Sequence, residues 1–143
     1  MNWKNEAIER LTKYAAMVQA VENIPLELSR LEKASTGLRG CRTDKIRVSS
    51  SPSRQEDILL GNMIKQEALA RSYENAKAWV DTTAKALSVL NSDEERILQQ
   101  MYIYPQKGVV NQLCSELGME QSSIYRKRDQ ALYRFTLALF GIN

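Results

Sequence analysis

The sequence predicts an all-α protein, and three observations lead to that fold class. Glycine and proline, which most often interrupt a helix, number only six and three in 143 residues. Apolar residues recur at intervals of three and four along most of the chain, the spacing of an amphipathic helix. Segments with strand-like alternation of apolar and polar residues are scarce. We therefore expect a long N-terminal helical hairpin over residues 1–90, followed by a C-terminal module of three helices over residues 91–143.

The first expected helix covers about residues 3–21. Its apolar stripe contains Ile8, Leu11, Ala15 and Val18, which recur at intervals of three and four. Pro25 disfavours helical geometry at Ile24 but suits the first turn of a new helix. We therefore expect a kink or a short break at Pro25, followed by a helix in which Leu28 and Leu31 share a face.

Residues 35–54 are expected to form a flexible linker, because serine, glycine and proline are concentrated there. The net charge of the chain is +3, and the positive excess lies in residues 36–54. There, five basic residues accompany the single acid Asp44: Arg39, Arg42, Lys45, Arg47 and Arg54. This basic loop is either a solvated linker or an arm that reaches along DNA. Residues 55–90 contain no proline and only one glycine, which predicts a long helix that packs antiparallel to the first arm.

Shorter helices are expected in the C-terminal module. Ser92 and Glu95 have the spacing of a capping box, in which each side chain accepts from the other residue's backbone N–H. A helix is therefore expected to begin at Ser92 and to continue until Pro105. The next two helices are expected over residues 109–118 and about 121–139.

Residues 110–127 match the helix-turn-helix template, in which two helices meet at a steep angle across a tight turn. Gly118 can adopt the positive φ that such a turn needs. We expect Met119 to fill the turn, Cys114 to allow a close helix crossing, and Ile124 to point into the core. The other residues expected on the inner side are Val110, Leu113, Leu117, Ala131 and Phe135.

The outward face of the last helix is the candidate surface for reading double-stranded DNA. At 100° per residue, with Ile124 inward, this face carries Ser122, Tyr125, Arg126, Asp129 and Tyr133. Arginine can bind guanine through two hydrogen bonds in the major groove, which makes Arg126 the candidate base reader. Lys127 and Arg128 flank it within reach of phosphates. Ser122 and Ser123 supply short donors in the first turn.

Residues 92–143, from SDEERILQQMY to GMEQSSIYRKRDQALYRFTLALFG, resemble the C-terminal module of small phage late-gene regulators of the ArpU and RinA type. That module is similar to region four of bacterial sigma factors, and the long helical N-terminal half also resembles the family. The likeness depends on the acidic capping turn, the Leu-Gly turn and the IYR...AL...F run. It implies a phage-encoded activator that binds promoters of late packaging or lysis genes and contacts host RNA polymerase. By this resemblance, the DNA-contacting residues are Gln121, Ser122, Ser123, Tyr125, Arg126 and Arg128.

Acidic residues in the module favour a second interpretation. Residues 91–143 carry six acidic and six basic side chains, and a neutral segment has few cations for counterion release on DNA. Asp129 would repel phosphates unless it pairs with an arginine or accepts from a cytosine amino group, and Glu120 is not a preferred helix cap. The alternative is a helical adaptor or assembly factor that does not bind DNA. If the module does bind DNA, a homodimer formed through the long helices would supply a second recognition helix.

Several functional classes are disfavoured by the residue types that the sequence lacks. It has no histidine, the commonest general base and transition-metal ligand, so we expect no catalytic site, metal, cofactor or small-molecule substrate. Cys41 and Cys114 form no Cys-x-x-Cys motif, which indicates a reducing compartment. No segment approaches the roughly 20 apolar residues of a membrane-spanning helix, and residues 1–10 are followed by no apolar signal core. We therefore expect a cytoplasmic protein that is not an enzyme.

Overall fold

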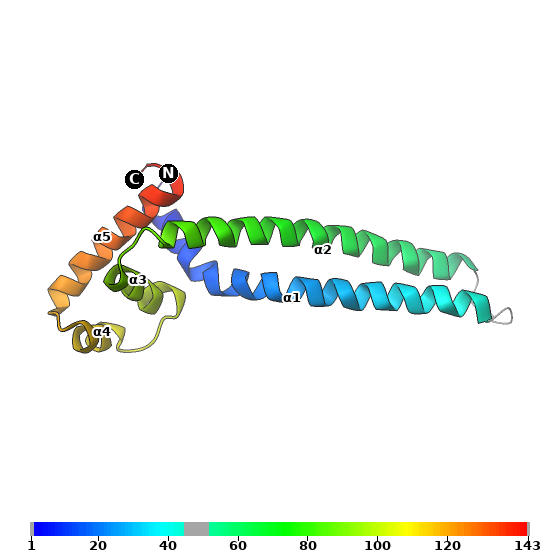
Figure 1. The fold of residues 1–143 in the computed structure, drawn as a ribbon, viewed down its shortest axis with the longest axis horizontal. Coiled ribbons are helices and arrows are strands. Elements are labelled where there is room, and N and C mark those ends of the chain that lie inside the picture. The colour runs from blue at the N-terminus through cyan, green and yellow to red at the C-terminus, as the bar shows by residue number, and fades with distance from the viewer. Residues whose placement is uncertain (1, 45–51, 143) are drawn as a thin grey trace. The chain divides into compact units, whose positions relative to one another are not determined.

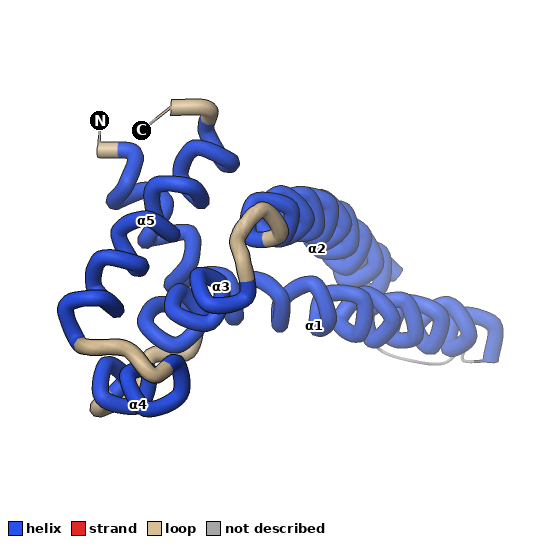
Figure 2. The backbone as a smooth tube through the Cα atoms, turned by 60° about the vertical axis from the view of Figure 1, so that its left-hand side comes forward, coloured by secondary structure: helices blue, strands red, loops and turns tan. Residues whose placement is uncertain are grey.

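The computed structural model describes residues 2–44 and 52–142, and within them it confirms the all-α class. Figure 2 shows helices joined by loops, with no strand in the described part of the chain. In chain order (Figure 1), the elements are α1 (Trp3–Asp44), α2 (Pro52–Leu87), α3 (Ser92–Leu98), the π-helical turn η1 (Gln99–Ile103), α4 (Val109–Leu117) and α5 (Gln121–Phe140). None of these described helices has both the length and the apolar character that crossing a membrane requires.

The chain forms two compact units. Unit 1 consists of residues 1–18 and 78–143, and unit 2 of residues 19–77. The boundary expected at residue 90 therefore lies inside unit 1. The reason is that the start of α1 and the end of α2 share one hydrophobic core with the C-terminal helices.

The main core of unit 1 brings together side chains that are distant in sequence. Its buried members are Ala7, Leu11, Ala86, Leu87, Leu90, Leu98, Ile103, Ala131, Leu132 and Phe135. The Trp3 ring contacts the Phe140 ring with centroids 5.0 Å apart, and the Arg10 guanidinium lies 4.9 Å from the centroid of Trp79. These contacts fix the first turns of α1 against the end of α5, and burial of this apolar surface stabilises the unit.

Unit 2 is an antiparallel helical hairpin made by the C-terminal part of α1 and most of α2 (Figure 1). The residues that face the partner helix recur at alternating intervals of four and three, as in a coiled coil. They are Val21, Ile24, Leu28, Leu31 and Ser35 in α1, and Leu59, Asn62, Gln66, Leu69, Tyr73 and Ala76 in α2, all buried or half-buried. We call this set the seam. Asn62 Nδ2 donates to Ser35 Oγ across it at 3.4 Å.

Two expectations about the hairpin are corrected by the structure. Of the kink or short break expected at Pro25, the break is absent, since α1 continues through this residue. The seam residues on both sides of Pro25 pack towards α2 and offset the one backbone hydrogen bond that proline cannot donate. The linker expected over residues 35–54 is also too long, since α1 extends to Asp44 and α2 begins at Pro52. Ser35 is buried in the seam. Residues 45–51 lie outside the described residues.

The capping box of α3 is displaced by one residue from its expected position. Asn91 is the N-cap instead of Ser92, and its Oδ1 accepts from the Glu94 N–H at 2.9 Å. Glu94 Oε1 accepts in return from the Asn91 N–H at 3.3 Å. The α-helix also ends before Pro105, because α3 gives way to η1, where the Tyr104 N–H donates to the Gln99 carbonyl at 2.7 Å. The bounds of α4 and α5 agree with the expected ones to within one residue.

Candidate nucleic-acid interface

A tight turn joins α4 to α5. Gly118 ends α4 with a φ of 63°, the positive value that the sequence predicts for this position. The Met119 N–H donates to the Cys114 carbonyl at 3.2 Å and closes the turn. Only three residues, 118–120, separate the two helices, so the turn between them is very short.

A small core beneath this turn holds α4 against α5. Its buried members are Ile97 from α3, Val109 and Leu113 from α4, and Ile124 from α5. Cys114 and Met119 pack at its edge, together with Met101, Val110 and Leu117. The inward positions predicted for Ile124 and Met119 are therefore confirmed, and Ile124 fixes the rotation of α5 about its own axis.

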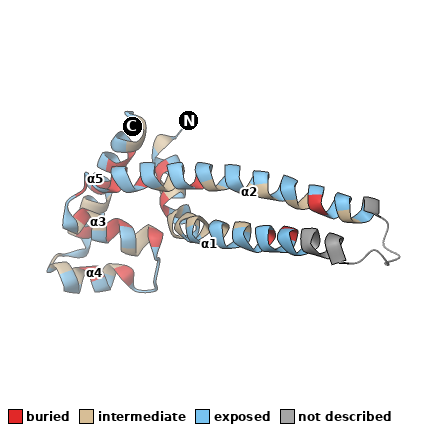
Figure 3. Cartoon of the chain, turned by 45° about the vertical axis from the view of Figure 1, so that its right-hand side comes forward, coloured by how far each residue is buried: buried red, intermediate tan, exposed pale blue. Residues whose placement is uncertain are grey.

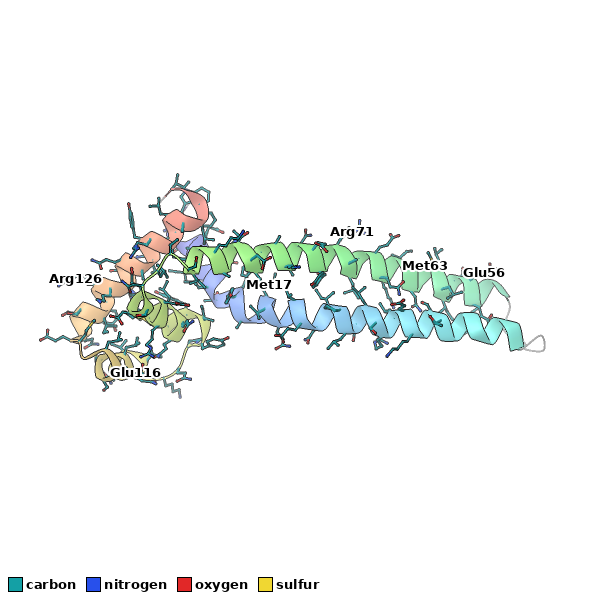
Figure 4. The ribbon with its side chains drawn as sticks, viewed as in Figure 1. Met17, Glu56, Met63, Arg71, Glu116 and Arg126 are labelled. Atoms are coloured by element: carbon teal, nitrogen blue, oxygen red, sulfur yellow. The ribbon has the colours of Figure 1, made fainter. Side chains whose placement is uncertain are left out.

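That rotation presents one face of α5 to solvent. Ala131 and Phe135 are fully buried on the inner side, as predicted, and Leu132 joins them. The outer side carries exposed Ser122, Tyr125, Arg126, Asp129 and Tyr133, and Figure 4 labels Arg126 on this helix. Of the seven predicted site residues, Gln121, Ser122, Tyr125 and Arg126 are exposed, and Ser123, Lys127 and Arg128 are half-buried.

The three consecutive basic residues of α5 differ in their partners. Lys127 Nζ lies 3.4 Å from an oxygen of Asp93 at the start of α3. Arg128 pairs with Asp129 at 3.0 Å, and its guanidinium lies 5.0 Å from the centroid of the Tyr125 ring. Arg126 forms no ion pair with any residue that the structure describes. Its guanidinium is therefore available to an external ligand.

Asp129, whose role the sequence leaves open, pairs with cations of its own chain. Besides Arg128, Lys4 Nζ lies 3.7 Å from the same carboxylate. Its charge is therefore partly compensated within the protein. Of the two ways in which Asp129 could avoid repelling phosphates, the structure shows pairing with an arginine.

An open groove of about 610 Å³ runs beside the exposed face. It is lined by Asn91, Glu94, Arg126, Lys127, Asp129, Gln130, Tyr133 and Arg134. Sequence reasoning missed Gln130 and Arg134, although both follow Arg126 at intervals of four and therefore share its side of the helix. Arg134 donates to Glu94 Oε1 at 2.6 Å and to the Val89 carbonyl at 3.1 Å. It therefore ties α5 to the start of α3.

Two titratable groups near α4 and α5 have shifted pKa values. Burial raises the pKa of the Tyr102 phenol, and the nearby Asp129 carboxylate raises it further while Arg128 opposes the effect. Hydrogen bonds from Gln100 and Gln112 hold the pKa of Glu116 below its ordinary value. At neutral pH Tyr102 is therefore uncharged and Glu116 is ionised. Within residues 2–44 and 52–142, no group of three His, Cys, Asp or Glu side chains is arranged to hold a metal ion.

The chain matches no protein-family model, no curated protein and no solved structure. Its function is therefore inferred from this face of α5 and from the sequence resemblance. The face combines a helix of fixed rotation, an unpaired arginine, and a groove that offers amide, phenol and guanidinium donors.

Proposed function

We propose that the protein is a sequence-specific transcription regulator that binds double-stranded DNA. In this proposal α4, the turn at 118–120 and α5 act as a helix-turn-helix, and α5 enters the major groove. The observation that carries the proposal is Arg126, an exposed and unpaired arginine on the outer face of a helix whose inner face is fully buried. A rigid helix with a free guanidinium suits bidentate recognition of guanine.

The neighbouring residues have supporting roles in the proposed complex. Gln121 and Ser122 lie exposed in the first turn of α5, where short polar side chains can reach bases or phosphates. Ser123 and Tyr125 are proposed to contact the DNA backbone. Lys127 and Arg128 are proposed to contact phosphates, and each would first have to exchange its present carboxylate partner.

The proposed biological setting depends on the resemblance to ArpU- and RinA-type regulators. We propose a phage-encoded activator of late packaging or lysis genes that acts in the host cytoplasm and contacts host RNA polymerase from the promoter. We also propose that two copies associate through the long helices, since a second recognition helix raises the affinity of a nearly neutral module. A monomeric mass by light scattering at working concentrations would contradict the dimer.

A specific observation favours a second candidate, the adaptor or assembly factor. Two of the three consecutive cations of α5 are already paired within the chain, Lys127 with Asp93 and Arg128 with Asp129. Such pairs lower the electrostatic attraction of the face for DNA phosphates. An adaptor would use the same groove for a protein ligand.

Selection from a randomised pool of duplexes separates the two functions. The experiment compares the wild-type protein with Arg126→Ala and with Arg71→Ala, which removes an exposed arginine of α2 in unit 2 (Figure 4). We expect the wild type and Arg71→Ala to enrich the same motif. Loss of the Arg126 contacts should weaken binding to that motif by about 5- to 150-fold, from the 1–3 kcal/mol of a bidentate arginine–guanine pair. No enrichment by the wild type would favour the adaptor.

A further inference from the structure

A second groove lies in unit 2 and shares no residue with the proposed DNA interface. Its volume is about 590 Å³. One wall comes from α1 and the other from α2, and the lining residues are Leu28, Glu32, Ser35, Thr36, Met63, Gln66, Glu67 and Ala70. Two antiparallel helices form such a furrow along their length, and a third helix can pack into it.

The hairpin leaves apolar surface beside this groove uncovered. Among the residues of unit 2 whose burial the structure describes, the buried apolar side chains are Leu31, Leu59 and Ala76, and Figure 3 shows most of α2 in the colour of exposed residues. Leu60, Met63 and Ile64 lie within little more than one turn of α2 and are 56%, 46% and 58% exposed. Met63 also lines the groove, so the apolar patch and the groove are continuous. Exposed apolar surface next to a furrow is typical of a protein interaction site.

The charges on the groove walls indicate the kind of ligand. Glu32 lies on the α1 wall and Glu67 on the α2 wall, and no lysine or arginine lines the groove. Neither carboxylate pairs with a basic side chain of the described residues, whereas Glu27 on the same hairpin pairs with Arg30 at 3.0 Å. The groove therefore offers the apolar side chains of Leu28, Met63 and Ala70 and a few polar groups between two uncompensated negative charges.

We propose that this groove docks a basic amphipathic helix of a partner protein. The apolar face of that helix would contact Leu28, Met63 and Ala70. Lysine or arginine residues beside its apolar face would meet Glu32 and Glu67. A second copy fits less well, because a symmetric contact through this face would bring the same two carboxylates of each copy together. The inference concerns unit 2 only and stands apart from the proposed DNA binding.

Designed peptides test the proposal with the full-length protein. One fluorescent three-heptad peptide carries leucine at the apolar positions of its heptads and lysine at the positions beside them. The other peptide is identical except that glutamate replaces lysine. Anisotropy titrations should show that the wild type prefers the lysine peptide. The Glu32→Lys/Glu67→Lys variant should bind the lysine peptide about 2- to 30-fold more weakly through the loss of two exposed ion pairs, and should prefer the glutamate peptide.

The control variant is Glu22→Lys/Asp57→Lys, which makes the same change in net charge at exposed positions that do not line the groove. It should retain the wild-type preference. Met63→Arg, which obstructs the groove at an exposed residue, should weaken binding of the lysine peptide, and circular dichroism confirms that each variant is folded. The proposal is overturned if the wild type binds neither peptide. It is likewise overturned if the control variant loses as much affinity for the lysine peptide as Glu32→Lys/Glu67→Lys does. It is also overturned if the wild type is a dimer that Glu32→Lys/Glu67→Lys converts to a monomer.

Discussion

The ion pair between Glu94 and Arg134 should be one of the strongest single contacts that hold α5 to α3. Only 4% of the Glu94 surface is exposed, and its carboxylate accepts from Arg134 Nη1 at 2.6 Å and from the Asn91 N–H at 3.3 Å. The Arg134 side chain is 49% exposed. Water can therefore solvate Arg134 when Glu94 is removed, whereas Glu94 stays buried when Arg134 is removed.

Removing either partner of this pair destabilises the protein by a different amount. Glu94→Ala removes a charged hydrogen bond and half of a capping box, but the half-exposed Arg134 regains water, so we expect a loss of about 2 kcal/mol. Arg134→Ala leaves the buried carboxylate with one backbone donor, which costs about 2–3 kcal/mol. The double variant has no unpaired charge, so the two losses should not add. The expected coupling free energy is about 1–2 kcal/mol.

Urea unfolding at pH 7, followed by far-UV circular dichroism, measures this double-mutant cycle. A matched cycle on Glu27 and Arg30 provides the control, because that pair is 3.0 Å apart but both side chains are more than half exposed. Its coupling free energy should not exceed about 0.5 kcal/mol. A coupling for Glu94 and Arg134 no larger than that of the control pair would refute the reasoning, since burial would then have no effect on the strength of the contact.

Three further predictions concern the same unit. Ile124→Ala should lower the free energy of unfolding by about 2–5 kcal/mol, measured in urea, because it opens a cavity in a fully buried site. Gly118→Ala should cost about 1–2 kcal/mol in the same assay, since φ at this position is 63°. Because burial raises the pKa of Tyr102 above its ordinary 10.0, its stabilising contribution should be intact below pH 10 and lost as the pH rises through the folded-state pKa. Tyr102→Phe should therefore lose less stability than the wild type in alkaline urea titrations, and equal losses would contradict this assignment.

Local patterns predict the C-terminal helices well because the information they use is local. The interval of three and four identifies Ala131 and Phe135 as inner residues of α5, and both are fully buried. Gly118 adopts a positive φ, which glycine tolerates far better than other residues do. The exposed positions of Ser122, Tyr125 and Arg126 follow from the same periodicity.

The capping box shows where local information ends. Asn91 and Ser92 are both good N-cap residues, and each is followed three positions later by a glutamate. What distinguishes the two registers is Arg134, which lies 40 residues from Glu94 in sequence and contacts its carboxylate. In the N-terminal hairpin, too, a contact distant in sequence overrides a local pattern. Serine and glycine near residue 35 suggest a loop, but Ser35 meets Asn62 of the facing helix, and that tertiary contact accompanies an unbroken α1.

The contacts that position α5 also reduce the positive charge on its exposed face. Asp93 engages Lys127, and Asp129 engages Arg128, so each of these cations would have to exchange a carboxylate for a phosphate. Such an exchange gains little free energy, because one anionic partner replaces another at a half-exposed site. Arg126 has no such competitor among the described residues. In the proposed complex, affinity from phosphates is therefore small, and discrimination among sequences depends chiefly on Arg126.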